Sequence, residues 1–171
     1  MRSLIQIQNK IISVSELGSF LETQKRMQNR IVFTNGCFDI LHKGHVEYLA
    51  KAADLGDILV VGINSDASVK RQGKGDERPI NAIDARATVL AALECVGAVI
   101  EFDDDTPLAL IEIIQPDVLV KGADYDPKIS DPNDSKYIVG REIVLEKGGS
   151  VEVIDFVPGF STTNIVNKLQ K

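Results

Sequence analysis

Two histidines, His42 and His45, are the only imidazoles of this 171-residue chain, and both lie in the stretch TNGCFDILHKGH. This stretch directly follows an apolar run, and a helix is expected to begin near Lys43. A helix N-terminus presents unpaired N–H groups and partial positive charge, which favour phosphate. Gly36 permits a tight turn with close backbone approach, and Gly44 leaves space between the imidazoles. Two imidazole donors at this place predict a site that binds one phosphoryl group and neutralises charge as it develops.

Three other interpretations of the stretch compete with a phosphate site. The histidines could be a pair of surface residues at a helix start. Cys37, Asp39, His42 and His45 have ligand types that suit zinc, but their spacing matches no usual structural zinc site. Cys37 could also be a nucleophile with a histidine base, although a cysteine in such a turn more often packs as a small apolar residue.

Composition excludes several classes of protein. The chain has 25 acidic and 19 basic residues, for a formal net charge of −6, so nucleic acid is not expected as a partner. Cys37 and Cys95 form no CxxC pattern, which is typical of free thiols in a reducing compartment. The first residues lack the apolar core of a signal peptide, and no apolar run is long enough to span a membrane. We therefore expect a cytoplasmic protein without a membrane partner.

Apolar runs alternate with helical patterns along the chain, and continuous apolar runs are typical of parallel strands covered on both faces. This alternation predicts an α/β fold, namely a three-layer, doubly wound parallel sheet of five strands. The five expected strands are Arg30 to Gly36, Asp57 to Asp66, Cys95 to Phe102, Pro116 to Gly122 and Ser150 to Phe156.

Start and stop signals mark the expected helices. Ser13 and Glu16 have the spacing of a capping box, Asn81 precedes another helix, and Thr106 followed by Pro107 opens a third. The expected helices follow Ser13, cover His45 to Gly56, Asn81 to Glu94 and Asp105 to Ile114, and close the chain in TTNIVNKLQK.

Ligands of doubly wound sheets bind beyond the carboxyl ends of the strands. In this chain that rule points to Thr34 to His45, Gly62 to Asp66, Lys121 to Tyr125 and Gly159 to Thr163. No GxGxxG follows the first strand, which disfavours a dinucleotide dehydrogenase. The sequence also lacks GxxxxGK[ST] and GxSxG, so a Walker-type ATPase and an α/β-hydrolase are disfavoured.

Two separated motifs carry a family resemblance. GCFDILHKGH resembles the signature of the HxGH nucleotidyltransferases, the cytidylyltransferase-like superfamily, and FSTTNIVNK resembles the second motif of that superfamily. The resemblance covers Arg30 to Lys171. It implies a Rossmann-like nucleotidyltransferase domain at residues 30–171, preceded by an N-terminal helical extension at residues 1–29.

Longer stretches narrow the resemblance. RPINAIDARATVLAALECV, DVLVKGADY and GFSTTNIVNKLQ are similar to the adenylyltransferase domain of heptose 1-phosphate adenylyltransferases, here as a stand-alone version without the sugar kinase domain. This implies transfer of AMP from ATP to D-glycero-β-D-manno-heptose 1-phosphate. The products would be pyrophosphate and ADP-heptose, a precursor of lipopolysaccharide core or surface glycan.

One departure separates this chain from glycerol-3-phosphate cytidylyltransferases, which have an arginine and a glutamate ahead of the Ser-Thr-Thr run. Phe156 and Pro158 stand at those places here, which disfavours CTP and glycerol 3-phosphate. Two alternatives stay open: a nucleotidyltransferase for another phosphorylated acceptor, such as glycerol 3-phosphate, and a nucleotide-binding module without turnover.

The resemblance implies roles for individual residues. His42 and His45 would be catalytic at the α-phosphate, joined by Lys74 from a basic loop that could equally be a solvated surface loop. Magnesium is expected with ATP, without an assigned protein ligand, and a homodimer is expected. Expected to bind the nucleotide are Asn35, Gly36, Cys37, Phe38, Asp39, Gly44, Gly62, Asn64, Asp66, Lys121, Gly122, Asp124, Ser161, Thr162 and Thr163; expected to bind the acceptor are Arg71, Arg78 and Tyr125.

Overall fold

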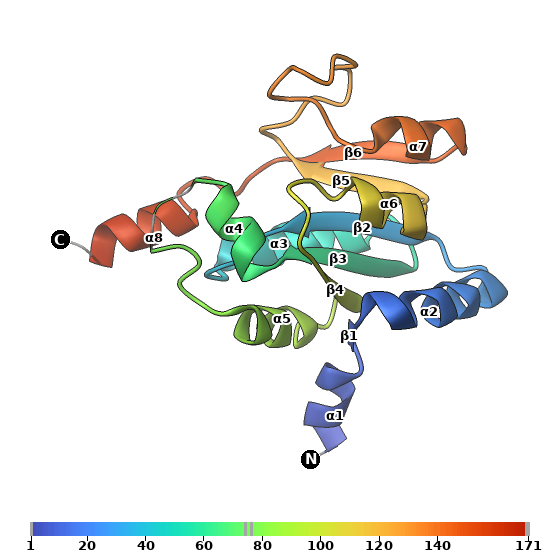
Figure 1. Ribbon diagram of the computed structural model, residues 1–171, viewed down its shortest axis with the longest axis horizontal. Coiled ribbons are helices and arrows are strands. Elements are labelled where there is room, and N and C mark those ends of the chain that lie inside the picture. Colours follow the sequence, from blue (N-terminus) through green and yellow to red (C-terminus); the bar gives the residue numbers. More distant parts are fainter. Residues whose placement is uncertain (1, 74, 76, 170–171) are drawn as a thin grey trace.

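A computed structural model describes residues 2–73, 75 and 77–169. Its centre is a sheet of six parallel strands in the order β1-β4-β3-β2-β5-β6 (Figure 1). The parallel α/β architecture predicted from the apolar runs is thereby confirmed. The strands are β1 (Ile11–Ile12), β2 (Ile31–Gly36), β3 (Ile58–Asn64), β4 (Ala98–Phe102), β5 (Val118–Gly122) and β6 (Ser150–Ile154).

The sheet has one strand more than the expected five. The additional strand is β1, where Ile11 pairs with Val99 and Ile12 with Ile100 at the edge of the sheet. Two residues are too few to show a strand pattern in a sequence, so this strand follows only from its pairing with β4. It belongs to the predicted N-terminal extension, whose boundary after residue 29 stays a prediction; Leu17 of the same segment is fully buried.

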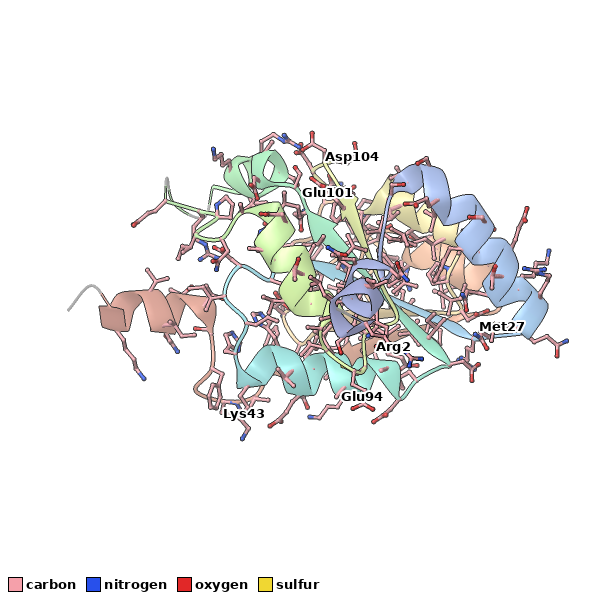
Figure 2. The ribbon with its side chains drawn as sticks, turned by 90° about the horizontal axis from the view of Figure 1, so that it is seen from below. Arg2, Met27, Lys43, Glu94, Glu101 and Asp104 are labelled. Carbon is pink, nitrogen blue, oxygen red and sulfur yellow. The ribbon has the colours of Figure 1, made fainter. Side chains whose placement is uncertain are left out.

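Neighbouring residues of a strand point to opposite faces of the sheet, and both faces are apolar. Val32 and Val61 pack in one core cluster, while Phe33 and Val60 pack in the other. Helices α1, α3 and α5 cover the first face, with α1 between the other two in Figure 2, and α2, α6 and α7 cover the second. The helices are α1 (Arg2–Gln8), α2 (Val14–Met27), α3 (Lys43–Ala53), α4 (Asp66–Arg71), α5 (Ile83–Ala91), α6 (Leu108–Ile114), α7 (Arg141–Glu146) and α8 (Thr162–Leu169).

Helix starts follow the expected signals in part. The Ser13 backbone N–H donates to Glu16 at 2.8 Å, as a capping box requires. Asn81 does not cap α5, because its side chain donates instead to the Asp39 carbonyl at 2.7 Å, and the helix begins two residues later. At α6 the residue at the cap position is Pro107.

The order of the strands in the sheet indicates where a ligand would bind. The chain moves from β2 outward through β3 to β4 and then returns to the other side of β2 with β5, so the winding direction reverses between β2 and β5. Open α/β sheets bind ligands beside the carboxyl ends of the strands at such a point. Figure 1 shows α8 beyond this end of the sheet. Among the described residues, no helix combines the length and apolar character needed to cross a membrane.

Candidate functional site

A pocket of about 540 Å³ lies at the carboxyl ends of β2 and β5. An adjoining hollow of about 420 Å³ shares several of its walls and adds Asp39, Arg78 and Thr163. The structure therefore gathers most of the predicted site residues, although they are spread over more than a hundred positions. Those that line the main pocket are Asn35, Gly36, Cys37, Phe38, His42, Gly44, His45, Asn64, Lys121, Gly122, Asp124, Tyr125, Ser161 and Thr162.

His42 and His45 are stacked at the start of α3. Their ring centroids are 3.9 Å apart and the rings are inclined by only 15°. His42 is the N-cap of α3: its backbone carbonyl accepts the N–H of His45 at 2.9 Å, and its Nδ1 shares the same N–H at 3.4 Å. A Cβ on Gly44 would lie 3.1 Å from the His42 ring and 3.2 Å from Phe160, so only a glycine lets both aromatic side chains approach this closely.

Burial keeps the histidine pair neutral. Loss of hydration lowers the pKa of His42 below its usual 6.5. Burial, with a smaller contribution from His42, lowers the pKa of His45 to about 4, and the backbone of Ile40 opposes this shift. Nδ1 of His45 is buried and has no hydrogen-bond partner among the described residues. Near neutral pH the pair therefore presents neutral N–H donors rather than fixed positive charges.

Asp39 holds the turn between β2 and α3 in place. Its carboxylate is buried and accepts the backbone N–H groups of Ile80 and Asn81 at 2.9 Å, and Arg78 forms an ion pair with it. These contacts tie the turn to the segment that leads into α5. The predicted role of Asp39 was to bind nucleotide, but the structure engages its carboxylate within the protein.

Arg86 is a buried residue of α5 that the sequence analysis did not single out. Its side chain is 2% exposed and donates to the carbonyls of Asn81, Cys37 and Asn64 at 2.7 to 2.9 Å, and to the Asp66 carboxylate at 2.6 Å. One guanidinium thus joins the ends of β2 and β3 and the starts of α4 and α5. A signal was present, because Arg86 occupies the apolar stripe of its helix, three residues after Ile83 and four before Leu90.

Lys121 carries the charge on the β5 side of the pocket. Only 6% of it is exposed; its ammonium donates to Asn35 at 2.5 Å and lies 5.2 Å from the centre of the Tyr125 ring. Burial lowers the pKa of Lys121 to about 8, while Asp124 acts in the opposite direction. Sequence reasoning placed this lysine at the end of a strand in the crevice, and the structure places it there.

The segment before α8 forms the remaining wall. Ser161 is the capping residue, since its Oγ accepts the backbone N–H of Asn164 at 3.1 Å, and Thr162 is the first residue of the helix. Phe156 lies against Gly122, and Phe160 lies against Gly44 with its ring centroid 6.4 Å from that of His42. Both aromatic side chains are more than 40% exposed, which is unusual for phenylalanine and leaves two apolar faces at the pocket mouth.

Several predicted residues do not line the pocket. Gly62 lies within β3, where the absence of a side chain makes room for Phe33. Asp66 pairs with Arg86, and Arg71 pairs with Asp105 at 2.7 Å. Lys74 lies outside the described residues.

Other pocket residues had no signal in the sequence. Tyr48 donates to or accepts from Thr34 at 2.7 Å, and Gln72 accepts from the Cys37 thiol at 3.1 Å. The described part of the chain contains no cluster of three or more His, Cys, Asp or Glu side chains that could hold a metal ion. The zinc site considered for Cys37, Asp39, His42 and His45 is therefore not formed by the described residues.

Residues 33–168 match the family model described as Cytidylyltransferase-like, which covers most of the chain. The chain belongs to the cytidylyltransferase-like family, and the nucleotidyltransferase class predicted from its motifs is confirmed.

Curated relatives carry the same region within longer proteins. The bifunctional protein HldE of Geotalea uraniireducens (strain Rf4) is 53% identical over 161 residues, which is 94% of this chain and 31% of that protein. The bifunctional protein HldE of Helicobacter hepaticus (strain ATCC 51449 / 3B1) is 53% identical over 165 residues, 96% of this chain and 31% of that protein. The chain thus spans about a third of the length of the curated relatives it matches.

Two solved structures have similar folds. The lipopolysaccharide core biosynthesis protein from Thermoplasma volcanium GSS1 is 27% identical with a TM-score of 0.56, over 75% of this chain and 97% of that one. A pantoate-β-alanine ligase from Francisella tularensis, complexed with β-γ ATP and β-alanine, has a TM-score of 0.52 over 94% of this chain and 80% of that one. At 15% identity the second likeness shows the fold alone.

Proposed function

We propose that this nucleotidyltransferase transfers AMP from ATP to a sugar 1-phosphate, D-glycero-β-D-manno-heptose 1-phosphate, and releases pyrophosphate. The observation that carries the proposal is the joining, in one pocket, of the stacked histidines with the start of α8. The HldE relatives support the heptose acceptor, and the likeness to the lipopolysaccharide core biosynthesis protein of Thermoplasma volcanium supports a role in the synthesis of that core.

Reaction of the two substrates needs no strong general base. The second pKa of a phosphate monoester is about 6, so the acceptor is already a nucleophilic anion near neutral pH. One of its oxygens forms a bond to the α-phosphorus of ATP, and the bond from that phosphorus to the bridging oxygen breaks, so pyrophosphate leaves. Catalysis then consists of positioning the two phosphates and stabilising the charge that develops between them.

The pocket residues have distinct tasks in this mechanism. His42 and His45 donate to the α-phosphate and to the bridging oxygen, and backbone N–H groups of the β2–α3 turn line the same place. Ser161 and Thr162, at the N-terminus of α8, bind the β- and γ-phosphates. Lys121 supplies positive charge from β5. Magnesium would add charge neutralisation when it accompanies the triphosphate, and the pocket offers it one carboxylate, that of Asp124.

Release of pyrophosphate from ATP and a panel of phosphorylated acceptors tests this function. We expect release with D-glycero-β-D-manno-heptose 1-phosphate and at least tenfold less with its α anomer, with glucose 1-phosphate or with glycerol 3-phosphate. Preference for CTP and glycerol 3-phosphate would support a cytidylyltransferase instead. Tight ATP binding without release for any acceptor would indicate a nucleotide-binding module without turnover.

A further inference from the structure

The hollow of about 420 Å³ beside the main pocket is a separate space with its own walls. His45 and Thr162 line both spaces, so the two meet beside the histidine pair and the start of α8. Arg78 lines only the smaller one; it belongs to the connection between α4 and α5, which runs beside α8 in Figure 1. A ligand that extends through both spaces therefore passes His45.

Arg78 offers hydrogen-bond donors to this hollow. Its side chain is 13% exposed, and its Nε forms an ion pair with the buried carboxylate of Asp39. Among the residues that the structure describes, none accepts a hydrogen bond from the two terminal NH₂ groups of the guanidinium. Asp39 thus holds the guanidinium at one nitrogen and leaves the other two for a ligand. A planar pair of NH₂ groups matches two oxygens of a phosphate.

The charge of Asp39 is offset from more than one side, so it does not cancel this positive group. Its carboxylate also accepts the backbone N–H groups of Ile80 and Asn81 at 2.9 Å. The first residues of α8, Thr162 and Thr163, form another wall of the hollow, and a helix N-terminus adds partial positive charge. The hollow therefore combines a fixed guanidinium with the positive end of a helix.

The walls of the two spaces differ in chemistry. The main pocket has four aromatic faces for a base or a sugar ring: Tyr48, Tyr125, Phe156 and Phe160. Beside His45, the one aromatic side chain among the described walls of the hollow is Phe38. Phosphate groups have no apolar surface to bury, so the hollow suits them and the main pocket suits a nucleoside. In a triphosphate bound across both spaces, the bond between the α- and β-phosphates lies beside His45.

We propose that the hollow is the pyrophosphate site of this nucleotidyltransferase and that Arg78 binds the β- and γ-phosphates through its terminal NH₂ groups. When the acceptor oxygen bonds to the α-phosphorus, the bond from that phosphorus to the bridging oxygen breaks. Its electron pair stays with the leaving pyrophosphate, and Arg78 stabilises the resulting charge without transferring a proton. The proposal rests on the proposed function for the triphosphate donor, not for the acceptor, and it gives Arg78 a different ligand from the acceptor that the sequence suggested.

Two variants that break the same ion pair from opposite ends test the proposal. Calorimetry with inorganic pyrophosphate and magnesium should show binding weakened at least about tenfold in Arg78→Gln, because two charged hydrogen bonds are lost. Asp39→Asn should weaken it by less than about threefold, since it removes a negative charge from beside the anion. Equal losses in the two variants would mean that the ion pair only holds the turn, and would overturn the proposal.

Two further measurements exclude a general disturbance of the site. AMP lacks the β- and γ-phosphates, so its Kd should be the same within about twofold in wild type and Arg78→Gln. Arg78→Lys keeps a positive charge beside Asp39 but lacks the planar pair of NH₂ groups, so it should fold and still bind pyrophosphate at least about fivefold more weakly. It decides the question if Arg78→Gln does not fold. Wild-type affinity for pyrophosphate in folded Arg78→Lys would contradict the proposal.

Kinetics separate the donor from the acceptor. In the pyrophosphate-release assay, Arg78→Lys should raise the KM for ATP and change the KM for the acceptor by less than about threefold. A raised KM for the acceptor with an unchanged Kd for pyrophosphate would place the acceptor at Arg78 instead. If no acceptor released pyrophosphate, the adenylyltransferase proposal would fall, whereas the titrations with pyrophosphate would still decide the role of Arg78.

Discussion

The two walls of the pocket are held in different ways. The β2–α3 turn is joined to other elements by buried side chains: Asp39 binds the segment before α5, and Arg86 binds the ends of β2 and β3. The wall before α8 has mostly local contacts, such as the cap from Ser161 to Asn164 and the packing of Phe160 beside His42. Its two phenylalanines are exposed, whereas Cys37, Phe38 and Asp39 of the turn are buried.

This difference between the two walls suits two requirements of the proposed reaction. Donors that stabilise a transition state act best when their positions are fixed before the substrate arrives, and the turn meets that condition. The segment before α8 is proposed to bind the triphosphate, so it must let ATP enter and pyrophosphate leave. A segment with few long-range contacts can move enough for both steps. The comparison predicts that substitutions in the turn reduce stability or turnover, while substitutions before α8 mainly alter nucleotide affinity.

Removing Arg86 should have the largest effect. Arg86→Ala leaves the buried carbonyls of Cys37 and Asn64 without this donor and should reduce the free energy of unfolding by about 3–5 kcal/mol. Urea unfolding measures this loss. Arg26→Ala is the matched control: Arg26 is exposed and its side chain donates a long hydrogen bond, of 3.4 Å, to Thr23, so its loss should cost less than about 0.5 kcal/mol. A cost below about 1 kcal/mol for Arg86→Ala would show that the turn is not held through this residue.

Removing either imidazole should abolish most turnover with little change in ATP binding. His42→Ala or His45→Ala should lower kcat more than about a hundredfold, equivalent to about 3 kcal/mol of transition-state stabilisation. Calorimetry should find the Kd of ATP changed by less than about threefold, because these donors act mainly where charge develops. Near-normal kcat in both variants would contradict the catalytic assignment.

The smallest effect is expected before α8. Ser161→Ala removes the cap of α8 and should cost about 1 kcal/mol of local helix stability, which raises the KM for ATP by about fivefold. The midpoint of global unfolding should hardly change, because no described side chain of α8 belongs to either core cluster. If global stability fell as much as nucleotide affinity, the contrast between the two walls would be wrong.

The sequence predicts the fold well because its signals are local. Apolar runs such as DILVVGINSD predict β3, and the alternation of strands with helices predicts a doubly wound parallel sheet. The two histidines and the Ser-Thr-Thr run could also be recognised from the sequence, because each motif is a short run of neighbouring residues. The two-residue strand β1 was not visible, because it exists only through its pairing with β4.

Residues whose roles depend on distant partners could not be assigned in this way. Asp39 could bind a ligand if its carboxylate were free, but Arg78 and the N–H of Ile80 contact it and make it a structural residue. The sequence around Asp39 does not show these contacts, because both partners lie about 40 residues further along the chain. Arg71 lies in a basic stretch of the sequence, but its side chain forms an ion pair with Asp105, which follows β4. Gly62 follows the pattern of a binding glycine, but the ring of Phe33 from the neighbouring strand explains it.

Capping of α3 by His42, one of the two histidines proposed to be catalytic, has a consequence for observing the site. The amide proton of His45 is shared between the backbone carbonyl of His42, at 2.9 Å, and Nδ1 of its ring, at 3.4 Å. Its rate of exchange with deuterium in the solvent therefore reports on how often the first turn of α3 opens beside the two imidazole rings. A single protected amide at the start of a helix thus provides a measure of how rigidly the site is held, readable in the resting protein without a substrate or a label.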